Sequence, residues 1–479
     1  MSAAPGPAAP IALRLLPDTA TSGPRGQLLL GGVDTVALAE QFGTPLFVYD
    51  EEHLRRRCRQ AAQAFPGGAY YATKAFLCGA MAKVAHEEGM RLDVASGGEL
   101  ALALRAGVPA QDLLLHGNNK SDQELAAALH VGVGRIVIDS FDEIDRLERL
   151  LGQRSGVRDR YGAGDDRPKV LIRVTPGLHV HTHQYISTGQ EDSKFGFGLA
   201  SGSAAAAIAR LRRPDCPVRL VGLHLHIGSQ VFVADNFARA IEAVAPFVRE
   251  AGLAELNIGG GLGVAYVAAE HSESITDWGQ RVHAACAAAG IEAVISAEPG
   301  RAIAAQAAIT LYRVGTVKDL PGIRTYVAVD GGMIDNPRPA MYGSEYEAFL
   351  PRALGASRPR RVRVVGKHCE SGDVLLHDAA VPEDLAVGDL LATPVTGAYG
   401  WSMGSNYNRM GRPAIVFVAH GQARLVVRRE FDEDLMLTDL ALDPPAPDQP
   451  ASSPGSESES GSGSASGSAA SGGSGTARR

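Results

Sequence analysis

Residues 91–132 read RLDVASGGELALALRAGVPAQDLLLHGNNKSDQELAAALHVG and contain the alternation that decides the fold. Two short strand-like runs, RLDVAS and DLLLHG, are each followed by an alanine- and leucine-rich stretch with helical spacing. The same alternation continues through RIVID and FDEIDRLERLL, VLIRVT, LVGLHLH and NFARAIEAVAPFVREAG, and ELNIGG. Because strands that alternate with helices form parallel sheets, the pattern predicts a (β/α)8 TIM-type barrel over residues 45–305.

The sequence texture changes after about residue 306. The runs ITLYRVGTVKDL, TYVAVDGG, RVRVVGKHC and AIVFVAHGQARLVVRRE predict strands separated by turns. We therefore expect residues 306–444 to form an all-β domain of sandwich or barrel type, which a strand within 26–44 joins. The Ala/Pro-rich leader, 1–25, and the Ser/Gly-rich tail, 445–479, are expected to be disordered because such compositions bury little apolar surface.

The composition argues against several classes of function. The chain has 46 Lys and Arg against 53 Asp and Glu, and its formal net charge is −7 at pH 7. The interspersed charges give no basic stripe for nucleic acid and no polybasic segment for a membrane, and no apolar run reaches roughly 18 residues. The five cysteines form no CxxC pair, so neither a disulfide framework nor a structural zinc site is expected. We expect a cytoplasmic protein that acts on a small, soluble molecule.

A single lysine, Lys74, stands in the apolar and aromatic stretch YYATKAF at residues 70–76. One interpretation is structural: the side chain lies along apolar surface and keeps its ammonium in water. The other interpretation is chemical: a buried lysine at a strand end loses its proton readily and forms a Schiff base with a carbonyl compound such as pyridoxal phosphate. This stretch alone leaves both interpretations open.

Polar and glycine-rich segments follow the other predicted strands. In a barrel the chemistry lies at the carboxyl ends of the strands, so we expect these segments to face one pocket. GGGLG would let backbone N–H groups approach phosphate oxygens, although a tight structural turn has the same composition. Valine at position 264 breaks the GxGxxG spacing, which disfavours a Rossmann dinucleotide site. The segments are Asp93, HGNNKS at 116–121, HVHTH at 179–183, HLHIGS at 224–229, GGGLG at 259–263 and EPGR at 298–301.

The HxH pairs suggest a rival hypothesis, a metal-dependent barrel hydrolase. His224 and His226, and the histidines within 179–183, have the alternate spacing that places two rings on one face of a strand. Metal barrels usually add a carboxylate ligand held by further hydrogen bonds, and no Asp or Glu has an evident place beside these histidines. A structural or substrate-contacting role, without a metal, is therefore favoured.

The predicted β-domain also carries polar, glycine-flanked segments. They are RPAMYG at 338–343, CESGD at 369–373 and GAYGWSMGSNYN at 397–408. Most buried cysteines are inert core packing, and Cys369 has that interpretation too. Its polar and glycine neighbours leave a functional cysteine as the alternative.

Taken in order, nine segments resemble the motifs of the diaminopimelate decarboxylase family. They are YATKA, LDVASGGEL, HGNNKS, GLHLHIGSQ, NIGGGLGVAY, EPGR, DNPRPAMYG, CESGD and GAYGWSMGSNYN, and the resemblance runs from about residue 30 to 440. It implies a pyridoxal-phosphate (PLP) enzyme that makes L-lysine and CO2 from meso-2,6-diaminopimelate, the last step of lysine biosynthesis. It also implies a fold-type-III architecture, an alanine-racemase-like barrel with a β-domain. The segment at 175–198 then resembles an active-site loop rather than a metal site.

The resemblance assigns residues to the cofactor. Lys74 would hold PLP as a Schiff base, Glu298 would keep the pyridine nitrogen protonated, and His226 would stack on the ring. Asp93 would contact the cofactor side of the pocket, and Tyr399 would close over the phosphate and the substrate. The phosphate would be held by Ser229, Gly259, Gly260 and Gly261 and by the backbone of Glu298, Pro299, Gly300 and Arg301.

The resemblance also assigns residues to the substrate and to a second subunit. Arg301, Arg338 and Tyr342 would grip the distal carboxylate, which an arginine fork reads in bidentate fashion. Glu370 would take the distal ammonium. Cys369 would come from the partner in a homodimer and protonate the carbanionic carbon after decarboxylation, so that each site is built from two chains.

Three further alternatives are compatible with a PLP-binding barrel. A related decarboxylase for another amino acid would have no need of the residues assigned to the distal carboxylate. An amino-acid racemase of the same fold would need a second base on the opposite face and has no use for CESGD. A PLP carrier without enzymatic activity is typically a barrel alone. The departures from the family pattern, among them the polar segment 154–168, touch none of the motifs.

Overall fold

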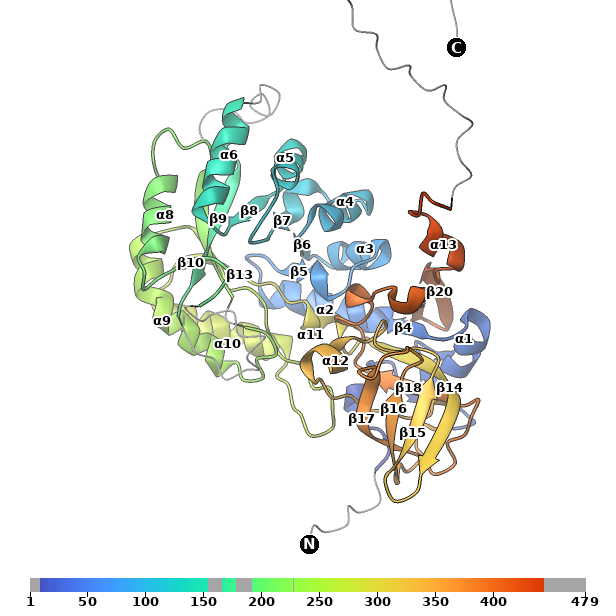
Figure 1. Cartoon of the computed structure of the whole chain (residues 1–479). Helices are drawn as coiled ribbons and strands as arrows, with labels where there is room; N and C mark the ends of the chain where they lie inside the picture. Colours follow the sequence, from blue (N-terminus) through green and yellow to red (C-terminus); the bar gives the residue numbers. More distant parts are fainter. Residues whose placement is uncertain (1–8, 154–165, 178–191, 227, 443–479) are drawn as a thin grey trace, which may run out of the picture. The chain divides into compact units, whose positions relative to one another are not determined.

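The computed structural model describes residues 9–153, 166–177, 192–226 and 228–442. These residues contain a parallel barrel sheet, a mixed sheet and a small three-stranded sheet (Figure 1). In the described ranges no helix is both long and apolar enough to cross a membrane.

The parallel sheet is a barrel whose eight strands are ordered as they are in the chain. Its two ends meet at a parallel bridge between Ala69 and Ala297, where the Tyr70 N–H donates to the Ala297 carbonyl at 2.8 Å. A short extra strand, β10 (Phe197–Gly198), pairs with β9. The predicted (β/α)8 barrel is thereby confirmed. Its strands are β5 (Tyr70–Ala72), β6 (Arg91–Val94), β7 (Leu113–Leu115), β8 (Arg135–Ile138), β9 (Lys169–Thr175), β11 (Arg219–Leu225), β12 (Glu255–Asn257) and β13 (Val294–Ser296).

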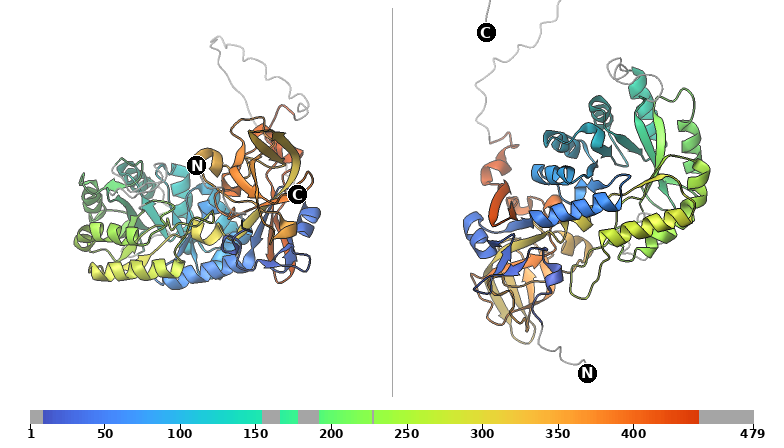
Figure 2. Two further views of the ribbon diagram at one scale, coloured as in Figure 1. Left: turned by 90° about the horizontal axis from the view of Figure 1, so that it is seen from below. Right: turned by 180° about the vertical axis from the view of Figure 1, so that it is seen from behind.

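Helices connect the barrel strands and lie on the outside of the sheet (Figure 2). Local sequence sets their limits: α5 begins with a capping box in which Ser121 and Glu124 bond each other's backbone N–H groups, and it ends at Gly132 in a left-handed conformation. The helices are α2 (Glu51–Ala64), α3 (Gly79–Glu87), α4 (Gly97–Arg105), α5 (Asp122–Val131), α6 (Phe141–Gln153), α8 (Ser203–Leu211), α9 (Asp235–Ala251) and α10 (Ile275–Ala288).

The barrel interior changes from apolar to polar along the strands. One buried cluster fills part of it and consists of Tyr70, Leu114, Val137, Leu171 and Val221. His116, Asp139 and Arg173 each follow a member of this cluster by two residues. Because side chains two residues apart point to the same face of a strand, these polar groups also point inward, nearer the carboxyl ends of the strands. The strand geometry thus concentrates charge at that end of the barrel.

The second sheet combines one early strand with the C-terminal part of the chain. It runs β17-β16-β15-β14-β4-β19-β20, and β18 pairs with β14. Short helices α11 (Arg301–Ala304) and α12 (Arg338–Tyr342) lie in connecting segments, and α13 (Asp432–Met436) follows the last strand. The strands are β4 (Leu46–Asp50), β14 (Ala308–Leu320), β15 (Arg324–Val329), β16 (Arg360–Val365), β17 (Val374–Val381), β18 (Leu390–Pro394), β19 (Ala414–Ala419) and β20 (Gln422–Val427).

The early part of the chain differs from the sequence-based expectation. β4 was expected at the start of the barrel, but it pairs with β14 and β19 in the second sheet. All five of its residues are buried, so it shows no alternation that would reveal its faces. The segment 26–44 adds no strand to this sheet. It forms α1 (Thr35–Phe42) and part of the small sheet of β1 (Thr21–Ser22), β2 (Leu28–Leu30) and β3 (Val33–Asp34).

The leader is ordered from residue 9, which corrects the prediction of disorder up to residue 25. In and beside a 3-10 turn at Leu13–Leu15, the side chains of Ile11, Leu15 and Leu16 are buried, whereas Leu13 is exposed. The alanine and proline content hid this short apolar run, IALRLL, which suffices to dock the segment. The rest of the leader, 1–8, and the predicted disordered tail lie outside the described residues.

Candidate active site

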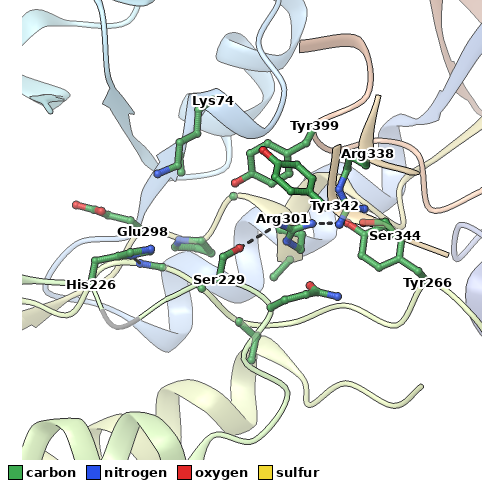
Figure 3. A pocket seen from close by; sticks show the side chains of 18 of the residues that line it. Lys74, His226, Ser229, Tyr266, Glu298, Arg301, Arg338, Tyr342, Ser344 and Tyr399 are labelled. Atoms are coloured by element: carbon green, nitrogen blue, oxygen red, sulfur yellow. Dashed lines mark hydrogen bonds between the residues drawn. The ribbon is translucent and has the colours of Figure 1, made fainter. Parts of the chain in front are cut away.

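A cavity of about 510 Å³ lies at the carboxyl ends of the barrel strands, beside loops of the β-domain (Figure 3). The barrel and α11 supply most of its wall, and the β-domain supplies the remainder. The structure therefore brings together residues that are more than 300 positions apart, such as Lys74 and Tyr399. The predicted site residues in the wall are Lys74, Asp93, His226, Ser229, Gly260, Gly261, Glu298, Pro299, Gly300, Arg301, Arg338, Tyr342 and Tyr399.

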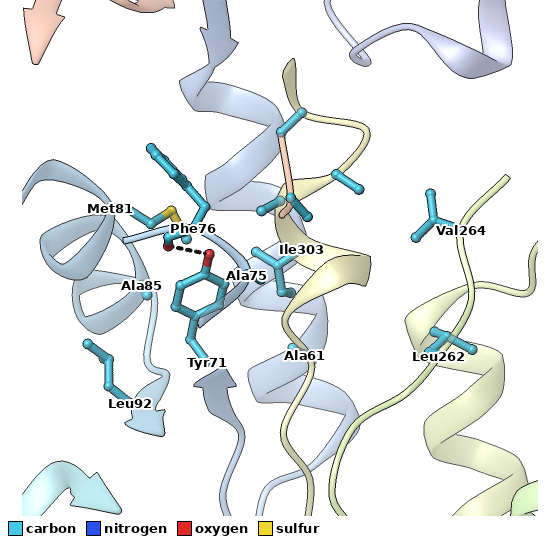
Figure 4. Packing of buried hydrophobic residues seen from close by; sticks show 14 of the residues in the cluster. Ala61, Tyr71, Ala75, Phe76, Met81, Ala85, Leu92, Leu262, Val264 and Ile303 are labelled. Atoms are coloured by element: carbon cyan, nitrogen blue, oxygen red, sulfur yellow. Dashed lines mark hydrogen bonds between the residues drawn. The ribbon is translucent and has the colours of Figure 1, made fainter. Parts of the chain in front are cut away.

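Lys74 lies in the single 3-10 turn Thr73–Ala75 that directly follows β5, and its side chain lines the cavity. The turn packs firmly: Phe76 is fully buried, and the Tyr71 hydroxyl donates to the Phe76 carbonyl at 2.7 Å (Figure 4). Apolar side chains of α3 and β6 surround this bond. A rigid turn therefore presents a flexible amine to the cavity.

The charge state of Lys74 differs from the sequence-based expectation. The Lys74 side chain is exposed to the open cavity, and the protein around it removes part of its solvent, which lowers the pKa of the amine. Tyr399, Asp93 and Glu298 together raise the pKa by more, so the net value lies above the ordinary one. The sequence predicted a lysine that burial leaves easily deprotonated. Only the assembled barrel reveals that two carboxyl groups share the pocket. Lys74 is thus an ammonium here and must give up a proton before it acts as a nucleophile.

Glu298 is a buried carboxylate with protein groups on both oxygens. Its Oε1 lies 2.8 Å from His116 Nε2 and 2.9 Å from Asn257 Nδ2, and its Oε2 lies 3.1 Å from His224 Nε2. Burial alone raises the pKa of Glu298, but His116 and His224 outweigh burial and hold the pKa well below the ordinary value. Glu298 is therefore an anion in the cavity wall. Sequence reasoning assigned Glu298 but missed the roles of His116 and Asn257.

Asp93 and His116 form a second charged pair beside Glu298. Asp93 Oδ1 lies 3.7 Å from His116 Nε2. Burial raises the pKa of Asp93 to about 6, and His116 opposes part of that shift. Burial lowers the pKa of His116, yet Asp93 and Glu298 together raise it above the ordinary value. HGNNKS was recognised as a strand-end segment, but nothing in the sequence indicates that its histidine faces these two carboxyl groups.

The structure separates the two histidines of the HxH pair at 224 and 226. His224 bonds to Glu298, whereas His226 Nδ1 accepts the Gly260 N–H at 3.3 Å. Ligand atoms of His116, His224 and Glu298 do lie within 4.8 Å of one another, close enough to hold a metal ion. In the structure these atoms hydrogen-bond directly to each other instead. HVHTH, and most of the segment interpreted as an active-site loop, lie outside the described residues.

The glycine loop after β12 brings bare backbone to the cavity. A Cβ atom at Gly260 would lie 2.2 Å from the Glu298 carbonyl oxygen. Gly261 adopts a φ of +112°, and a Cβ there would lie 2.2 Å from the Gly228 carbonyl oxygen. Gly259 does not line the cavity, but its N–H donates to Asn257 Oδ1 at 2.8 Å. Only glycine fits this close backbone contact, so the part of the cavity wall formed by the glycine loop is backbone without side chains.

Two buried arginines form the opposite part of the wall. Arg301 donates to the Tyr266 hydroxyl at 2.6 Å and to Ser229 Oγ at 3.0 Å. Arg338 donates to the Tyr346 hydroxyl at 2.6 Å and lies over the Tyr266 ring, 4.3 Å from its centroid. Among the described residues neither arginine forms an ion pair with a carboxylate. Such a pair of cations is suited to bind an anion such as a carboxylate. Tyr266 and Tyr346 were missed, because neither stands in a distinctive sequence pattern.

Tyr399 reaches the cavity from the β-domain in an uncommon conformation. Its φ is +58°, in the left-handed region that residues other than glycine rarely occupy. The Tyr399 N–H donates to the Ala75 carbonyl at 2.8 Å, and its ring lies 4.6 Å from the Arg301 guanidinium carbon. Non-glycine residues in this conformation cluster at functional sites. The hydrogen bond joins the β-domain to the turn that carries Lys74.

Cys369 and Glu370 are predicted site residues that the structure leaves outside the cavity of the same chain. Cys369 is exposed, and its N–H donates to Asn408 Oδ1 at 3.2 Å. Glu370 is also exposed and accepts the Gly372 N–H at 3.1 Å. Neither side chain lines the cavity. Their predicted roles therefore require a second chain.

Comparison with known proteins identifies similar sequences over most of the chain. A family model described as "Pyridoxal-dependent decarboxylase, pyridoxal binding domain" matches residues 51–305. A protein of Mycobacterium tuberculosis named diaminopimelate decarboxylase is 45% identical over 447 residues, which cover 89% of this chain and 98% of the relative. The Bacillus subtilis protein of the same name is 44% identical over 450 residues, with 88% and 97% coverage.

Solved structures show the same similarity in three dimensions. The diaminopimelate decarboxylase of M. jannaschii in complex with L-lysine superposes with a TM-score of 0.80 at 30% identity, over 90% of this chain and 99% of that chain. The Helicobacter pylori enzyme, also in complex with L-lysine, gives a TM-score of 0.76 at 28% identity, over 84% and 98%. Both structures share the arrangement of a barrel and a β-domain over nearly their whole length.

Proposed function

The chain belongs to the diaminopimelate decarboxylase family, and on this premise we propose how its residues divide the work of the reaction. It is a PLP-dependent decarboxylase that converts meso-2,6-diaminopimelate to L-lysine and CO2. The observation that supports our assignment most strongly is one cavity that contains Lys74, an anionic Glu298 and two arginines that pair with no carboxylate among the residues the structure describes. Each of these groups matches one part of the cofactor or the substrate.

The residues present fit PLP. An aldehyde needs an amine, and Lys74 supplies one on a fixed turn. A pyridine nitrogen needs an anion to keep its proton, and Glu298 is an anion held in place by three donors. A phosphate needs closely spaced backbone donors, and the glycine loop leaves Gly260 and Gly261 free of side chains at the cavity wall. These three features lie around one cavity.

The cofactor, when bound, supplies an electron sink for the pair left behind as CO2 departs. The protein has to provide the remaining conditions. Glu298 holds a proton at the pyridine nitrogen through its negative charge. His226, which burial keeps neutral by lowering its pKa well below the ordinary value, offers a flat and uncharged face to the ring. Lys74 would hold the cofactor through its amine, once its ammonium has released a proton to solvent.

Arg301, Arg338 and Tyr342 bind the distal carboxylate in our assignment. Arg338 is 5% exposed and donates only to a tyrosine hydroxyl in the described part of the chain, so its remaining N–H groups are available to a carboxylate. A planar guanidinium held against the Tyr266 ring is already oriented for bidentate binding. Such a contact with the distal carboxylate favours diaminopimelate over amino acids that lack a second carboxylate.

The partner subunit supplies the groups that one chain lacks, in our proposal. Cys369 and Glu370 lie exposed on the β-domain, outside the cavity of their own chain. We place the partner subunit's Cys369 beside the reacting carbon as the proton donor and the partner subunit's Glu370 beside the distal ammonium. The protein would then be an obligate homodimer with two shared sites. We also propose a cytoplasmic location, in keeping with reduced cysteines.

The visible spectrum of the purified protein, combined with product analysis, tests this function. We expect an absorption band from bound PLP that Lys74→Ala abolishes, and stoichiometric release of CO2 and lysine when meso-diaminopimelate is added. A band without turnover would transfer the assignment to a decarboxylase with another substrate. A protein that binds no PLP would contradict the proposed function altogether.

A further inference from the structure

We propose that Asn257 and His116 are positioning residues that act on the cofactor through Glu298. They keep its carboxylate ionised and fix its orientation, so that the proton between Glu298 and the ring nitrogen stays on the nitrogen. The inference rests on the proposed function, because it assigns a task to residues around the same PLP site. It is carried by three hydrogen bonds that converge on one buried side chain.

The orientation of the Asn257 amide follows from its neighbours. Its Oδ1 accepts the Gly259 N–H at 2.8 Å, so the amide oxygen must point toward the glycine loop. The NH2 group then points the other way and donates to Glu298 Oε1 at 2.9 Å. Asn257 is 1% exposed, so no solvent competes for either bond. One side chain thus joins the loop at the phosphate end of the cavity to the carboxylate at the ring-nitrogen end.

The two histidines differ in charge but both donate to Glu298. Burial lowers the pKa of His224 to about 4, so its ring is neutral, and a proton on Nε2 makes it a donor to Oε2. His116 lies between the carboxyl groups of Asp93 and Glu298, and this position favours its cationic form. A cation at 2.8 Å from Oε1 disfavours protonation of the Glu298 carboxyl.

The three donors limit how many further hydrogen bonds the Glu298 carboxylate accepts. A carboxylate has about four lone-pair directions on its two oxygens, and the protein occupies three of them. One direction is left for the ring nitrogen. A proton on Glu298 would lie in that remaining direction, and the three donors disfavour it there because each of them stabilises the negative charge of the carboxylate. The three donors therefore determine both the charge and the orientation of the carboxylate.

A comparison of two cofactors measures this effect without depending on turnover. The apoprotein is titrated with PLP and with 1-deaza-PLP, in which a C–H group replaces the ring nitrogen, and both dissociation constants are measured by fluorescence. Their ratio reports the contact with the nitrogen. Asn257→Asp keeps the shape but sets a second carboxyl against Glu298, and His116→Phe keeps the ring contact with His224 but removes the donor. In both variants we expect the preference for PLP to fall by about tenfold or more.

The controls separate positioning from general damage. His53→Gln alters another buried histidine, whose partner is Asp18, and should leave the preference unchanged. In a Glu298→Gln background His116→Phe should cause no further loss of preference, because the residue acts through the carboxylate. The inference is overturned if Asn257→Asp and His116→Phe weaken the binding of PLP and of 1-deaza-PLP equally. It is also overturned if His116→Phe lowers the preference for PLP further in the Glu298→Gln background. An apoprotein that fails to bind PLP at all would instead contradict the proposed function.

Discussion

The barrel end and the CESGD loop carry residues assigned to one reaction, but they differ in how far a single chain completes them. At the barrel end Glu298 is 5% exposed and bonded to three side chains. In the CESGD loop Cys369 and Glu370 are exposed and lie outside the cavity. At the barrel end the groups of one chain bond to each other, whereas the CESGD loop exposes its groups on the surface of the chain.

The difference follows from the elements that carry the residues. Parallel strands end side by side, so their side chains converge with no further partner. A loop of a β-domain has no such convergence and needs an opposing surface. In our proposal cofactor binding depends on one chain, whereas proton return and recognition of the substrate ammonium depend on two. The following predictions test this division, from the largest expected effect to the smallest.

Lys74→Ala should have the largest effect, a loss of kcat on the order of 10⁴-fold or more, because the cofactor loses its anchor. Cys369→Ala should lose on the order of 10²- to 10⁴-fold, as expected for a missing proton donor, yet keep the PLP band. A mixture of the two inactive variants, refolded together, should recover about a quarter of wild-type activity. Half of the dimers are then mixed, and each has one intact site of two.

Steady-state kinetics and the visible spectrum provide the measurements for this pair of variants. Cys286→Ala, a buried cysteine of α10, is the matched control and should behave like the wild type in both. A mixture that stays inactive would show that Cys369 serves its own chain or no site at all. The division between the two regions would then be wrong.

Arg338→Met should lower kcat/KM for diaminopimelate by about 10²-fold or more, since a distal carboxylate would be left buried without its partner, a cost of roughly 2 to 5 kcal/mol. The PLP band should persist because Arg338 has no part in cofactor binding. Steady-state kinetics test this expectation. Arg352→Met, which removes a partly exposed arginine paired with Asp384 and Asp389, should leave kcat/KM unchanged. Unchanged kcat/KM in Arg338→Met would remove that residue from the site.

Asp373 ties the two β-domain loops together, and Asp373→Asn should lower kcat by about tenfold. Its Oδ1 accepts the Met333 N–H at 2.7 Å and its Oδ2 accepts the His368 N–H at 2.9 Å. The first bond anchors the segment before Arg338, and the second anchors the segment before Cys369. An amide would replace one acceptor by a donor and cost about 1 to 3 kcal/mol.

The PLP dissociation constant separates this effect from general damage. We expect it to stay at the wild-type value in Asp373→Asn, because the bonds hold only the β-domain loops. Asp378→Asn, at an exposed position of β17, is the control. A variant that loses PLP together with activity would argue against separate regions.

Asp335→Asn should have the smallest effect, a change in the pH dependence of stability. Burial raises the pKa of Asp335 to about 7, against the opposing Gly332 N–H bond, and Oδ1 has no partner among the described residues. The native state therefore holds a proton that the unfolded state releases above about pH 4, and the wild type loses stability as the pH rises from about 4 to 7. The wild type should lose stability on the order of 2 to 4 kcal/mol over this range, and the neutral variant should not.

Urea unfolding of the holoprotein at pH 4 to 8 measures this difference. The stability of Asp335→Asn relative to the wild type should increase as the pH rises. Asp215→Asn, at an exposed position, should show a constant difference. A constant difference for Asp335→Asn would mean that the carboxyl group is ionised at neutral pH in the native state.

The predictability of the fold depended on whether a segment has a periodic pattern. Strands that alternate with amphipathic helices predicted the barrel, because the two periods are easy to distinguish. β4 has five buried residues and no alternation, so its place beside β14 and β19 depends on partners far along the chain. The ordered leader was missed because a short apolar run counted less than the surrounding alanine and proline.

The candidate site was predictable where a residue type is itself chemically distinctive. Lys74 and the arginines stand out in apolar or glycine-rich contexts. Asn257 does not: it ends a three-residue strand, and its role depends on a bond to Glu298 that exists only when β12 and β13 lie side by side. The raised pKa of Lys74 was unpredictable for the same reason, because it depends on carboxyl groups that other strands bring near.

The position of β4 has a consequence for biosynthesis on the ribosome. β4 is made before any barrel strand, yet its neighbours β14 and β19 begin at residues 308 and 414. During synthesis of the barrel this strand, whose five residues are all buried in the finished fold, has neither of its hydrogen-bonding partners. An unpaired strand edge favours association with other nascent chains. A chain that ends after the barrel would lack both partners of β4, so we expect it to aggregate rather than to form a smaller stable protein.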